Sequence, residues 1–413
     1  MSYLESTFRS LRHRAYRYYF AGQTVSTIGS WSQKVAQAWL VLELTGSGTL
    51  LGITVGLQQM PTLIITPWAG LLADRIDRRT MLLWAQVGAG APALILAGLA
   101  LLDALTLPLI MTLALALGVV EAFDKPVRHT FAADIVPVRD ITNAVTLNAT
   151  VFNAGKVLGP AAAGVTISLV GIAAPFVFNA LSYVVMILAL VRIRPDEIRP
   201  RAFDPPGPRA LRAGLAYARR TPLIGATLAL MTLTGLVAYE WTTAIPLLAR
   251  EHSADAATIG FFFTAMGIGA VGGSLSIAGT LTSTPRALLM GGTAFSVALG
   301  LVAAAPTLLS ALVAMVLLGA TATTLRALAT SLIQLEADPA VRGRMVSLLI
   351  LALNGTSPVS GPLIGLVSEH LGARAAVGLG AGICLLATGA TWRFLAVAAP
   401  SRLTRATPAT PAR

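Results

Sequence analysis

The amino-acid sequence predicts an all-α membrane protein with twelve transmembrane helices in two pseudo-symmetric six-helix bundles. Three observations support this prediction: a scarcity of charged residues, a succession of long apolar stretches, and a basic, proline-rich interruption near the middle of the chain. Hydrophobic residues make up 55% of the 413 residues and charged residues only 12%, and the mean hydropathy is +0.75. Because a soluble domain carries about 25% charged residues, most of this protein's surface is expected to face lipid.

Long apolar stretches follow one another along nearly the whole chain. A helix needs about 20 predominantly apolar residues to cross a bilayer, and many of these stretches are longer, which permits tilted helices. The twelve predicted spans cover residues 17–44, 49–73, 79–102, 105–125, 142–169, 173–193, 222–249, 257–280, 286–304, 307–328, 344–369 and 374–396.

Basic residues are distributed asymmetrically among these spans. The net charge is +12, which suits either a nucleic-acid partner or the excess of Lys and Arg in the cytoplasmic segments of a membrane protein. If residue 1 lies in the cytoplasm, 26 of the 30 basic residues fall on the cytoplasmic side; Arg250 and Arg374 fall outside, and Lys34 and Lys156 lie within spans. The asymmetry predicts a protein embedded in a lipid bilayer, with both termini cytoplasmic. A nucleic-acid partner is then not needed to explain the charge.

A segment rich in proline and arginine divides the twelve spans into two sets of six. Five prolines between residues 195 and 208 prevent a continuous helix there. The next residues, Arg209–Arg220, have the pattern of a short basic amphipathic helix on the inner membrane surface. The sequence therefore predicts an N-terminal six-helix bundle over residues 1–194, a cytoplasmic linker over 195–220, and a C-terminal six-helix bundle over 221–413.

The fifth and eleventh spans carry related patterns of glycine and proline. Paired spans interrupted by Gly and Pro in the two halves of a chain are typical of transporters built from repeats, whose substrate site lies near the membrane midplane between the halves. The residues concerned are Gly155, Gly159, Pro160 and Gly164 in the fifth span, and Gly361, Pro362 and Gly365 in the eleventh.

Several motifs resemble those of the major facilitator superfamily. Residues 70–79, Gly-Leu-Leu-Ala-Asp-Arg-Ile-Asp-Arg-Arg, resemble its signature loop after the second span, with Asp77 in the place of the usual second glycine. Residues 122–128 and 143–153 look like the branch that contains enterobactin exporters and related drug-efflux proteins, and the segment around Gly159 is similar to the antiporter motif of drug/proton exchangers. The resemblance covers nearly the whole chain.

This resemblance implies a secondary active transporter. Such a protein would export siderophore-like or drug-like small molecules by alternating access, with protons as the coupling ion, as a monomer and without a cofactor. Import or lipid flipping on the same fold stays open, because transport direction depends on how strongly each state binds its ligands. A membrane-embedded enzyme would need paired carboxylates, a histidine cluster or a nucleophile beside a base. The spans carry no such pattern, so no catalytic residue and no metal site are expected.

Two conformational sites are implied by the same resemblance. An ion-pair network at the cytoplasmic ends of the second and fourth spans is expected to lock the outward-open state; the alternative is that its arginines only set the topology. The glycine–proline run of the fifth span is expected to bend and seal one side of an exporter; the alternative is ordinary packing of small residues. The residues of the network are Gly70, Asp74, Arg75, Arg78, Arg79, Asp124 and Arg128, and those of the antiporter-like run are Gly155, Gly159, Pro160 and Gly164.

A polar stripe on the first span predicts the wall of a central cavity, because its members are spaced by three or four residues and share one helix face. An unpaired charge at the bilayer centre costs about 3 kcal/mol or more, so the charges within spans need partners. Glu240 is expected to bind the coupling proton and to pair with Lys34 or Lys156 in turn. The alternative is that the side chains of Lys34 and Glu240 only extend to the lipid headgroups at the membrane surface. Lysines in a cavity favour acidic or metal-chelating solutes. The candidate cavity residues are Gln23, Thr27, Ser30, Trp31, Lys34, Gln37, Asn153, Lys156, Glu240, Trp241 and Asn354.

Overall fold

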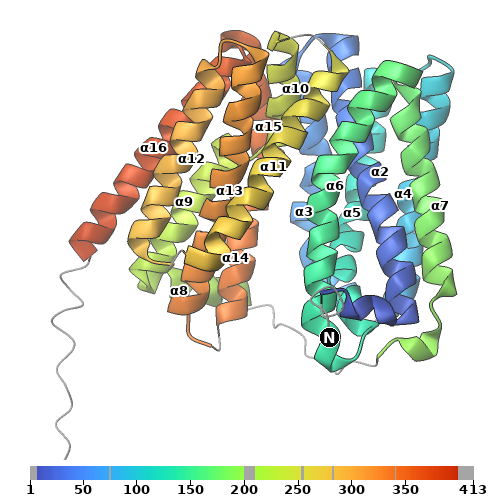
Figure 1. Cartoon of the computed structure of the whole chain (residues 1–413), viewed down its shortest axis with the longest axis horizontal. Helices are drawn as coiled ribbons and strands as arrows, with labels where there is room; N and C mark the ends of the chain where they lie inside the picture. The colour runs from blue at the N-terminus through green and yellow to red at the C-terminus, as the bar shows by residue number, and fades with distance from the viewer. Residues whose placement is uncertain are drawn as a thin grey trace, which may run out of the picture.

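The computed structural model describes residues 7–73, 76–199, 210–252, 255–280, 283–339 and 341–398, and these residues form helices joined by short connections (Figure 1). The first group of long helices comprises α2 (Arg14–Thr45), α3 (Gly48–Ala73), α4 (Arg78–Leu101), α5 (Leu107–Asp134), α6 (Ile141–Val170) and α7 (Ala173–Arg192). The second group comprises α8 (Ala210–Arg220), α9 (Pro222–Ala238), α10 (Trp241–His252), α11 (Ala256–Thr280), α12 (Pro285–Ala304), α13 (Leu308–Glu336), α14 (Arg342–Asn354), α15 (Ser357–Leu371) and α16 (Ala373–Ala398). Short 3-10 turns are η1 (Arg9–Arg12), η2 (Val138–Asp140) and η3 (Pro195–Glu197).

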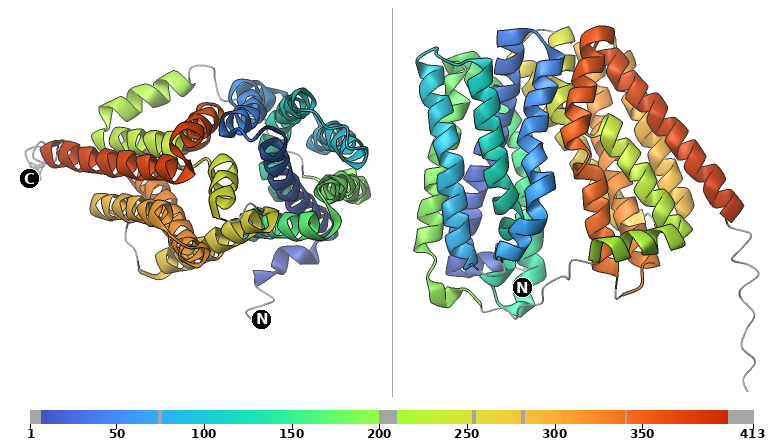
Figure 2. Two further views of the ribbon diagram at one scale, coloured as in Figure 1. Left: turned by 90° about the horizontal axis from the view of Figure 1, so that it is seen from above. Right: turned by 180° about the vertical axis from the view of Figure 1, so that it is seen from behind.

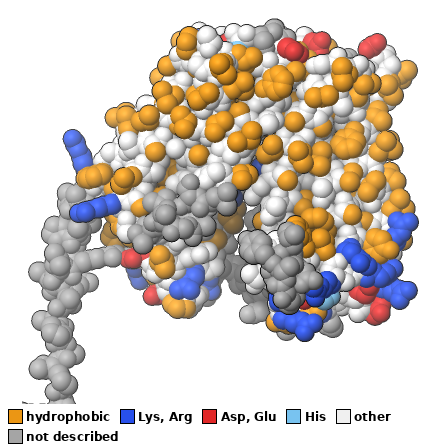
Figure 3. All heavy atoms as spheres, in the orientation of Figure 1, with side chains coloured by type: hydrophobic (Ala, Val, Ile, Leu, Met, Phe, Trp, Pro, Cys, Tyr) orange, Lys and Arg blue, Asp and Glu red, His pale blue; other side chains and the backbone are white. Residues whose placement is uncertain are grey.

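Ten segments of the described chain are long and apolar enough to cross a membrane. Two of them, Pro222–His252 and Arg342–Leu371, each consist of two consecutive helices. The long helices α2 and α6 are not among the ten. Hydrophobic side chains cover the middle of the visible surface, whereas Lys and Arg gather at its lower edge (Figure 3). This distribution is the one expected of a protein that crosses a bilayer several times.

Two spans that the sequence predicts as continuous helices are interrupted in the structure. The predicted span 222–249 is broken between α9 and α10, and the predicted span 344–369 is broken between α14 and α15. In the second case Gly355 disfavours the helix, and Pro358, in the first turn of α15, has no backbone N–H to donate to the carbonyl of Asn354. In the first case Pro246 cannot donate a backbone hydrogen bond to Thr242, which weakens the turn after the break.

Two other helices continue well past their predicted ends. Helix α5 reaches Asp134 and α13 reaches Glu336, although the apolar stretches end near residues 125 and 328. Arg128 and Arg326, which lie near the predicted ends of the fourth and tenth spans, are therefore inside their helices in the structure. Hydropathy falls where polar residues begin, whereas each helix ends only as it approaches the next proline, Pro137 or Pro339.

The helices form two groups that contact each other along few elements. Helices α2 to α7 pack mainly on one another, and so do α9 to α16; the principal contacts between the groups are α3 with α15 and α6 with α11. The two groups lie side by side in each view (Figures 1 and 2). Their surface is hollowed at its lower edge, between the groups (Figure 3). We call this edge, which carries η1 and α8, the basic end.

The amphipathic helix predicted after the prolines is α8, which packs against α9 and α14. A Cβ atom at Gly214 in α8 would lie 3.2 Å from side-chain atoms of Leu348 and Met345 in α14. Gly214 therefore lies on the face of α8 that packs closely on α14.

At the basic end, residues 7–13 are held against the start of α6. Arg9 Nε and His13 Nε2 lie 2.5 Å and 2.8 Å from the two carboxylate oxygens of Asp140. Asn143 accepts a hydrogen bond from the Ser10 amide (2.9 Å) and donates one to the carbonyl of Thr7 (2.7 Å). The hydrogen bond with His13, opposed by burial and assisted by Arg9, lowers the pKa of the Asp140 carboxyl below its ordinary value.

We expect the attachment of residues 7–13 to weaken only in acid. A carboxyl whose pKa is lowered in the folded state stabilises that state above its unfolded pKa of about 4 and loses this effect as pH falls through the lower folded value. The protection of the amides of residues 7–13 against hydrogen exchange, relative to the unfolded chain at the same pH, should therefore fall below about pH 4, and Asp140→Asn should lower this protection at neutral pH as well. Asp103→Asn, at an exposed site just after α4, is the control. Equal exchange in Asp140→Asn and the parent protein would contradict this role.

Candidate functional site

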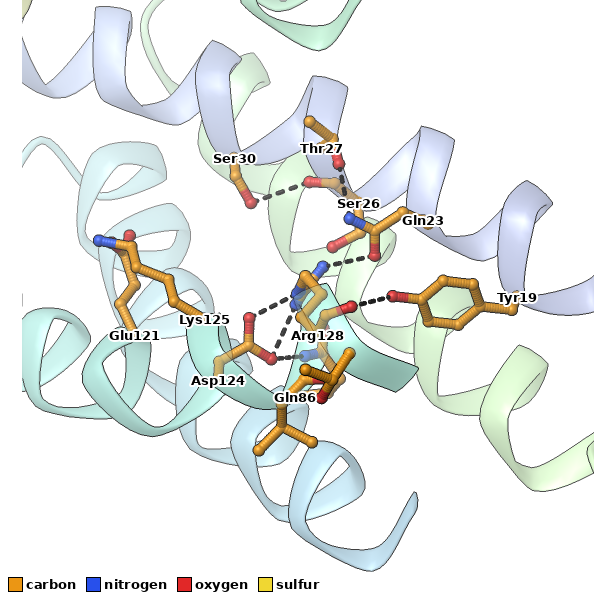
Figure 4. Close-up of polar contacts among 12 residues, drawn as sticks. Tyr19, Gln23, Ser26, Thr27, Ser30, Gln86, Glu121, Asp124, Lys125 and Arg128 are labelled. Atoms are coloured by element: carbon orange, nitrogen blue, oxygen red, sulfur yellow. Dashed lines mark hydrogen bonds and ion pairs between the residues drawn. The ribbon is translucent and has the colours of Figure 1, made fainter. Parts of the chain in front are cut away.

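A buried ion pair joins three helices of the first group (Figure 4). Arg128 Nε lies 2.5 Å from Asp124 Oδ2, one turn earlier in α5. Gln86 in α4 donates a hydrogen bond to Asp124 Oδ1 (2.9 Å), and Arg128 donates to Gln23 Oε1 in α2 (2.9 Å). Tyr19 also donates to the backbone carbonyl of Arg128 (2.9 Å). Asp124 and Arg128 are 9% and 8% exposed, so both charges depend on these polar partners.

Among the described residues, the predicted gating network is divided. Arg78 pairs with Asp134 (2.5 Å), which the sequence prediction omitted. Arg79 donates to the carbonyls of Leu190 and Val191 at the end of α7 (2.8 Å and 3.1 Å). The pair Asp124–Arg128 lies deeper in α5, apart from these contacts. Asp74 and Arg75 lie outside the described residues. Around Gly70 the structure describes the backbone of α3 but not the side chains.

A second polar cluster surrounds Glu121, a residue that the sequence prediction missed. Its carboxylate lies 3.4 Å from Lys34 Nζ and 2.8 Å from Lys125 Nζ. Gln58 in α3 donates to Glu121 (3.2 Å) and accepts a hydrogen bond from Gln37 (3.5 Å). The signal was available in the sequence, because an acidic residue within an apolar span is rare and usually functional.

The polar stripe of α2 faces other helices over most of its length. Gln23, Thr27 and Gln37 are buried, and Ser30 donates to the carbonyl of Ser26 (2.8 Å). The prediction that the whole stripe lines an open cavity is therefore wrong for these buried members. A polar side chain inside a membrane protein needs a partner, and neighbouring helices supply it here.

Lys34 and Trp31 lie where the two groups of helices meet. Together with Thr242 and Pro246 of α10 and Phe263 of α11, they line a small pocket. Lys34 Nζ lies 5.3 Å from the centroid of the Trp31 ring, a distance at which an ammonium group is attracted to the ring face.

Glu240 lies at the break between α9 and α10, on the second group. It is only 5% exposed, so its side chain does not extend to the lipid headgroups. The Thr242 hydroxyl donates a hydrogen bond to its carboxylate, and Ser357 at the start of α15 is a further hydrogen-bond partner. The next residue, Trp241, lies in an aromatic cluster with Tyr239 (centroids 5.8 Å apart) and Phe295 (6.5 Å).

The glycines of α6 allow two close helix contacts. A Cβ atom at Gly155 would overlap Thr27, and one at Gly159 would overlap Trp31, both in α2. A Cβ atom at Gly164 would lie 3.0 Å from the backbone of Ala257 in α11. Pro160 lies within α6 on the side that approaches α11. The glycines thus bring α6 into backbone contact range of both helices.

A second glycine seam, between α3 and α15, was not predicted. A Cβ atom at Gly48 would lie 2.9 Å from the carbonyl oxygen of Gly365, and one at Gly56 would lie 2.9 Å from that of Pro358. A Cβ atom at Gly52 would overlap the carbonyl group of Gly361. The spacing of four residues in α3 is the small-residue pattern of closely packed membrane helices, and it is visible in the sequence.

Glu369 closes this seam at the end opposite the basic end. Its carboxylate accepts hydrogen bonds from the Ser47 hydroxyl (2.6 Å) and the Thr49 amide (2.8 Å) at the start of α3. An acidic side chain at a helix N-terminus satisfies free amides and interacts favourably with the helix dipole. The two groups are therefore joined at this end by packing and by hydrogen bonds.

Known proteins similar to this chain are transporters. The enterobactin exporter EntS of Salmonella typhimurium is 26% identical over 343 residues, which cover 81% of this chain and 80% of that protein. The staphyloferrin A transporter of Staphylococcus aureus is 26% identical over 42% of this chain and 44% of that protein. Macrolide efflux protein A of Streptococcus pyogenes is 25% identical over 56% and 58%. The last two alignments thus span about half the length of those relatives.

Solved structures of transporters share the fold. The nucleoside transporter NupG superposes with a TM-score of 0.73 at 12% identity, covering 92% of this chain and 99% of that one. A bacterial homologue of the iron transporter ferroportin in an inward-facing state gives a TM-score of 0.73 at 16% identity, covering 95% and 99%. A family model described as "Transmembrane secretion effector" matches residues 5–407. The protein therefore belongs to this family of transporters within the major facilitator superfamily, and it is a multi-pass membrane protein.

Proposed function

We propose that the protein is a secondary active transporter that exports small molecules across a bacterial inner membrane by proton antiport with alternating access. The observation that supports this proposal best is the pair of helix seams, α3–α15 and α6–α11, combined with the hollow at the basic end. Two groups of helices that touch along narrow glycine-lined contacts can rock against each other and expose a central site to one side at a time.

We further propose twelve spans in two six-helix bundles, over residues 1–194 and 221–413, joined by the linker 195–220, in a monomer with both termini cytoplasmic. Helices α2 and α6 would raise the number of spans from ten to twelve. At 32 and 30 residues they are long enough. The buried polar residues of α2, such as Gln23 and Gln37, contact other helices and not lipid, and average hydropathy cannot register that orientation.

Proton coupling is proposed to involve Lys34 and the two carboxylates near it. Lys34 is paired with Glu121 in its own group of helices, while Glu240 of the other group is buried with hydroxyl partners and within electrostatic range of Lys34. Transfer of Lys34 from Glu121 to an ionised Glu240 would draw the two groups together near α10. Protonation of Glu240 would remove that attraction, so that proton binding favours one state over the other.

The proposed cargo is a siderophore-like or drug-like solute. Relatives named as exporters or transporters of enterobactin, staphyloferrin A and macrolides support this range. Export is favoured because two of these relatives are named for export or efflux. One of them, the enterobactin exporter, aligns over most of this chain. Import or lipid flipping on the same fold would be revealed by the direction of flux.

The coupling role of Glu240 can be tested in everted membrane vesicles. The vesicles would come from a strain without its own efflux pumps, and uptake of siderophores and a drug panel would be followed under an imposed pH gradient. We expect Glu240→Gln to reduce gradient-driven uptake by at least about tenfold, because an amide cannot exchange the proton. Glu43→Gln, at an exposed site on α2, should transport normally. Gradient-driven flux that is the same in Glu240→Gln and the parent protein would rule out this role.

A further inference from the structure

Lys156 points into the space between the two groups of helices. Successive residues of an α-helix are rotated by about 100°, and the neighbours of Lys156 define three of the four sides of α6. Gly155 approaches α2, Val157 contacts Gly267 of α11, and Leu158 is 51% exposed on the lipid-facing side. The remaining side, between α2 and α11, is that of Lys156, whose side chain is exposed there.

Arg326 occupies the corresponding space from the second group. One turn before it in α13, the carbonyl of Ala322 accepts a hydrogen bond from Tyr239, the residue just after α9 (2.8 Å). That face of α13 therefore looks toward α9 and the interior. Arg326 lies ten residues before the end of α13, about 15 Å along the axis, so it lies within the span and not in the loop.

The two cations are near each other and lack an acidic partner in the described part of the chain. The charged neighbours of Lys156 are Arg326 and Lys34, and Lys34 is already paired with Glu121. Neither Lys156 nor Arg326 forms an ion pair with any residue that the structure describes. Two uncompensated cations inside a membrane protein are costly, and an anionic ligand would remove that cost.

We propose that Lys156 and Arg326 together bind an anionic group, such as a carboxylate, of the transported solute. This inference rests on the proposed transport function and defines the chemical class of its cargo. Each bundle supplies one cation, so the anion bridges the two groups of helices. Closure of the basic end brings the cations together, which an empty site resists by charge repulsion. The anion offsets that repulsion, and the loaded protein closes more readily than the empty one.

The local charge can be measured without knowing the cargo. In a Cys384→Ser background, which removes the only cysteine, Asn153→Cys places a thiol one turn from Lys156. Labelling rates with the anionic sulfonatoethyl and the cationic trimethylammonioethyl methanethiosulfonates would be compared in nanodiscs of zwitterionic phosphatidylcholine. We expect Lys156→Gln or Arg326→Gln to lower the anionic-to-cationic rate ratio by about thirtyfold, because one charge at roughly 8 Å with an effective dielectric constant of about 40 changes the rate of each reagent by about sixfold, in opposite directions. Arg326→Lys should keep the ratio, and so should Arg286→Gln at an exposed site in α12.

Recognition of the anion is tested with citrate as the probe and triethyl citrate as its uncharged counterpart. Citrate should slow labelling of the reporter thiol by occlusion, and this protection should be lost in Lys156→Gln and in Arg326→Gln. The ester should give no protection. A rate ratio unchanged by Arg326→Gln, or equal protection by citrate and its ester, would overturn the proposal. Both measurements use purified protein, so a failure of the vesicle assay with Glu240→Gln would leave them intact.

Discussion

Asp124→Leu is expected to lower the free energy of unfolding by about 3–5 kcal/mol, because it leaves Arg128 buried without a counter-charge. The guanidinium would keep only its hydrogen bond to Gln23, and Gln86 would lose its acceptor. Such a loss is a large part of the total stability of an ordinary domain. Thermal unfolding of the purified protein in detergent, followed by fluorescence-detected size exclusion, measures the effect.

The ion pair predicts a specific pattern of rescue. The double variant Asp124→Leu/Arg128→Met should recover much of the lost stability, since replacing both partners of a buried pair by apolar residues is often neutral or stabilising. Arg219→Met, which removes an exposed charge from α8, should change the unfolding temperature little. A double variant no more stable than the single Asp124→Leu variant would show that the pair is not the source of the effect.

Gly52→Ala is expected to reduce transport by at least about tenfold, because the added methyl group would occupy the position of the Gly361 carbonyl. The overlap involves backbone on both sides of the seam, so a change of side-chain rotamer cannot relieve it. Helices α3 and α15 would have to separate, and the state in which this seam is closed would become less populated. Flux through a cycle that requires that state would fall.

The opening of the seam can be observed directly. In the Cys384→Ser background, Thr49→Cys places a thiol where a buried hydroxyl now lies beside Glu369. Its reaction with a hydrophilic maleimide should be faster in Gly52→Ala than in the parent. Gly98→Ala is the matched control, because a Cβ atom there has no neighbour within 4 Å. Normal transport and slow labelling in Gly52→Ala would show that the seam tolerates separation or does not form.

Hydropathy predicted the existence of most spans but not where their helices end or break. The helix containing Arg128 and the helix containing Arg326 both continue past the apolar residues, because a helix persists until its backbone is interrupted. The break before Trp241 and the break after Asn354 fall at short polar runs, residues 239–243 and 354–358, which an average over a whole span does not resolve. Prolines nearby indicated weak points without fixing the residue at which each helix stops.

In the candidate site, the sequence predicted several of the charged residues but not their partners. Lys34, Lys156 and Glu240 were predicted because charges within apolar spans are rare. Periodicity placed Gln23 and Lys34 on one face of α2, but it could not say that Gln23 would meet Arg128 while Lys34 would meet Glu121. Those partners are more than 80 positions away in the sequence, so only helix packing brings them together.

The sequence by itself determined an all-α membrane protein, three charged residues inside its spans (Lys34, Lys156 and Glu240), and its resemblance to the major facilitator superfamily. Composition and spacing are local properties, and lipid solvation depends on them directly. Only the tertiary structure decided which charges are compensated, that Glu121 lies between Lys34 and Lys125, and that Gly52 meets the backbone of α15. These outcomes depend on distances between segments remote in sequence, and close packing of helices sets those distances.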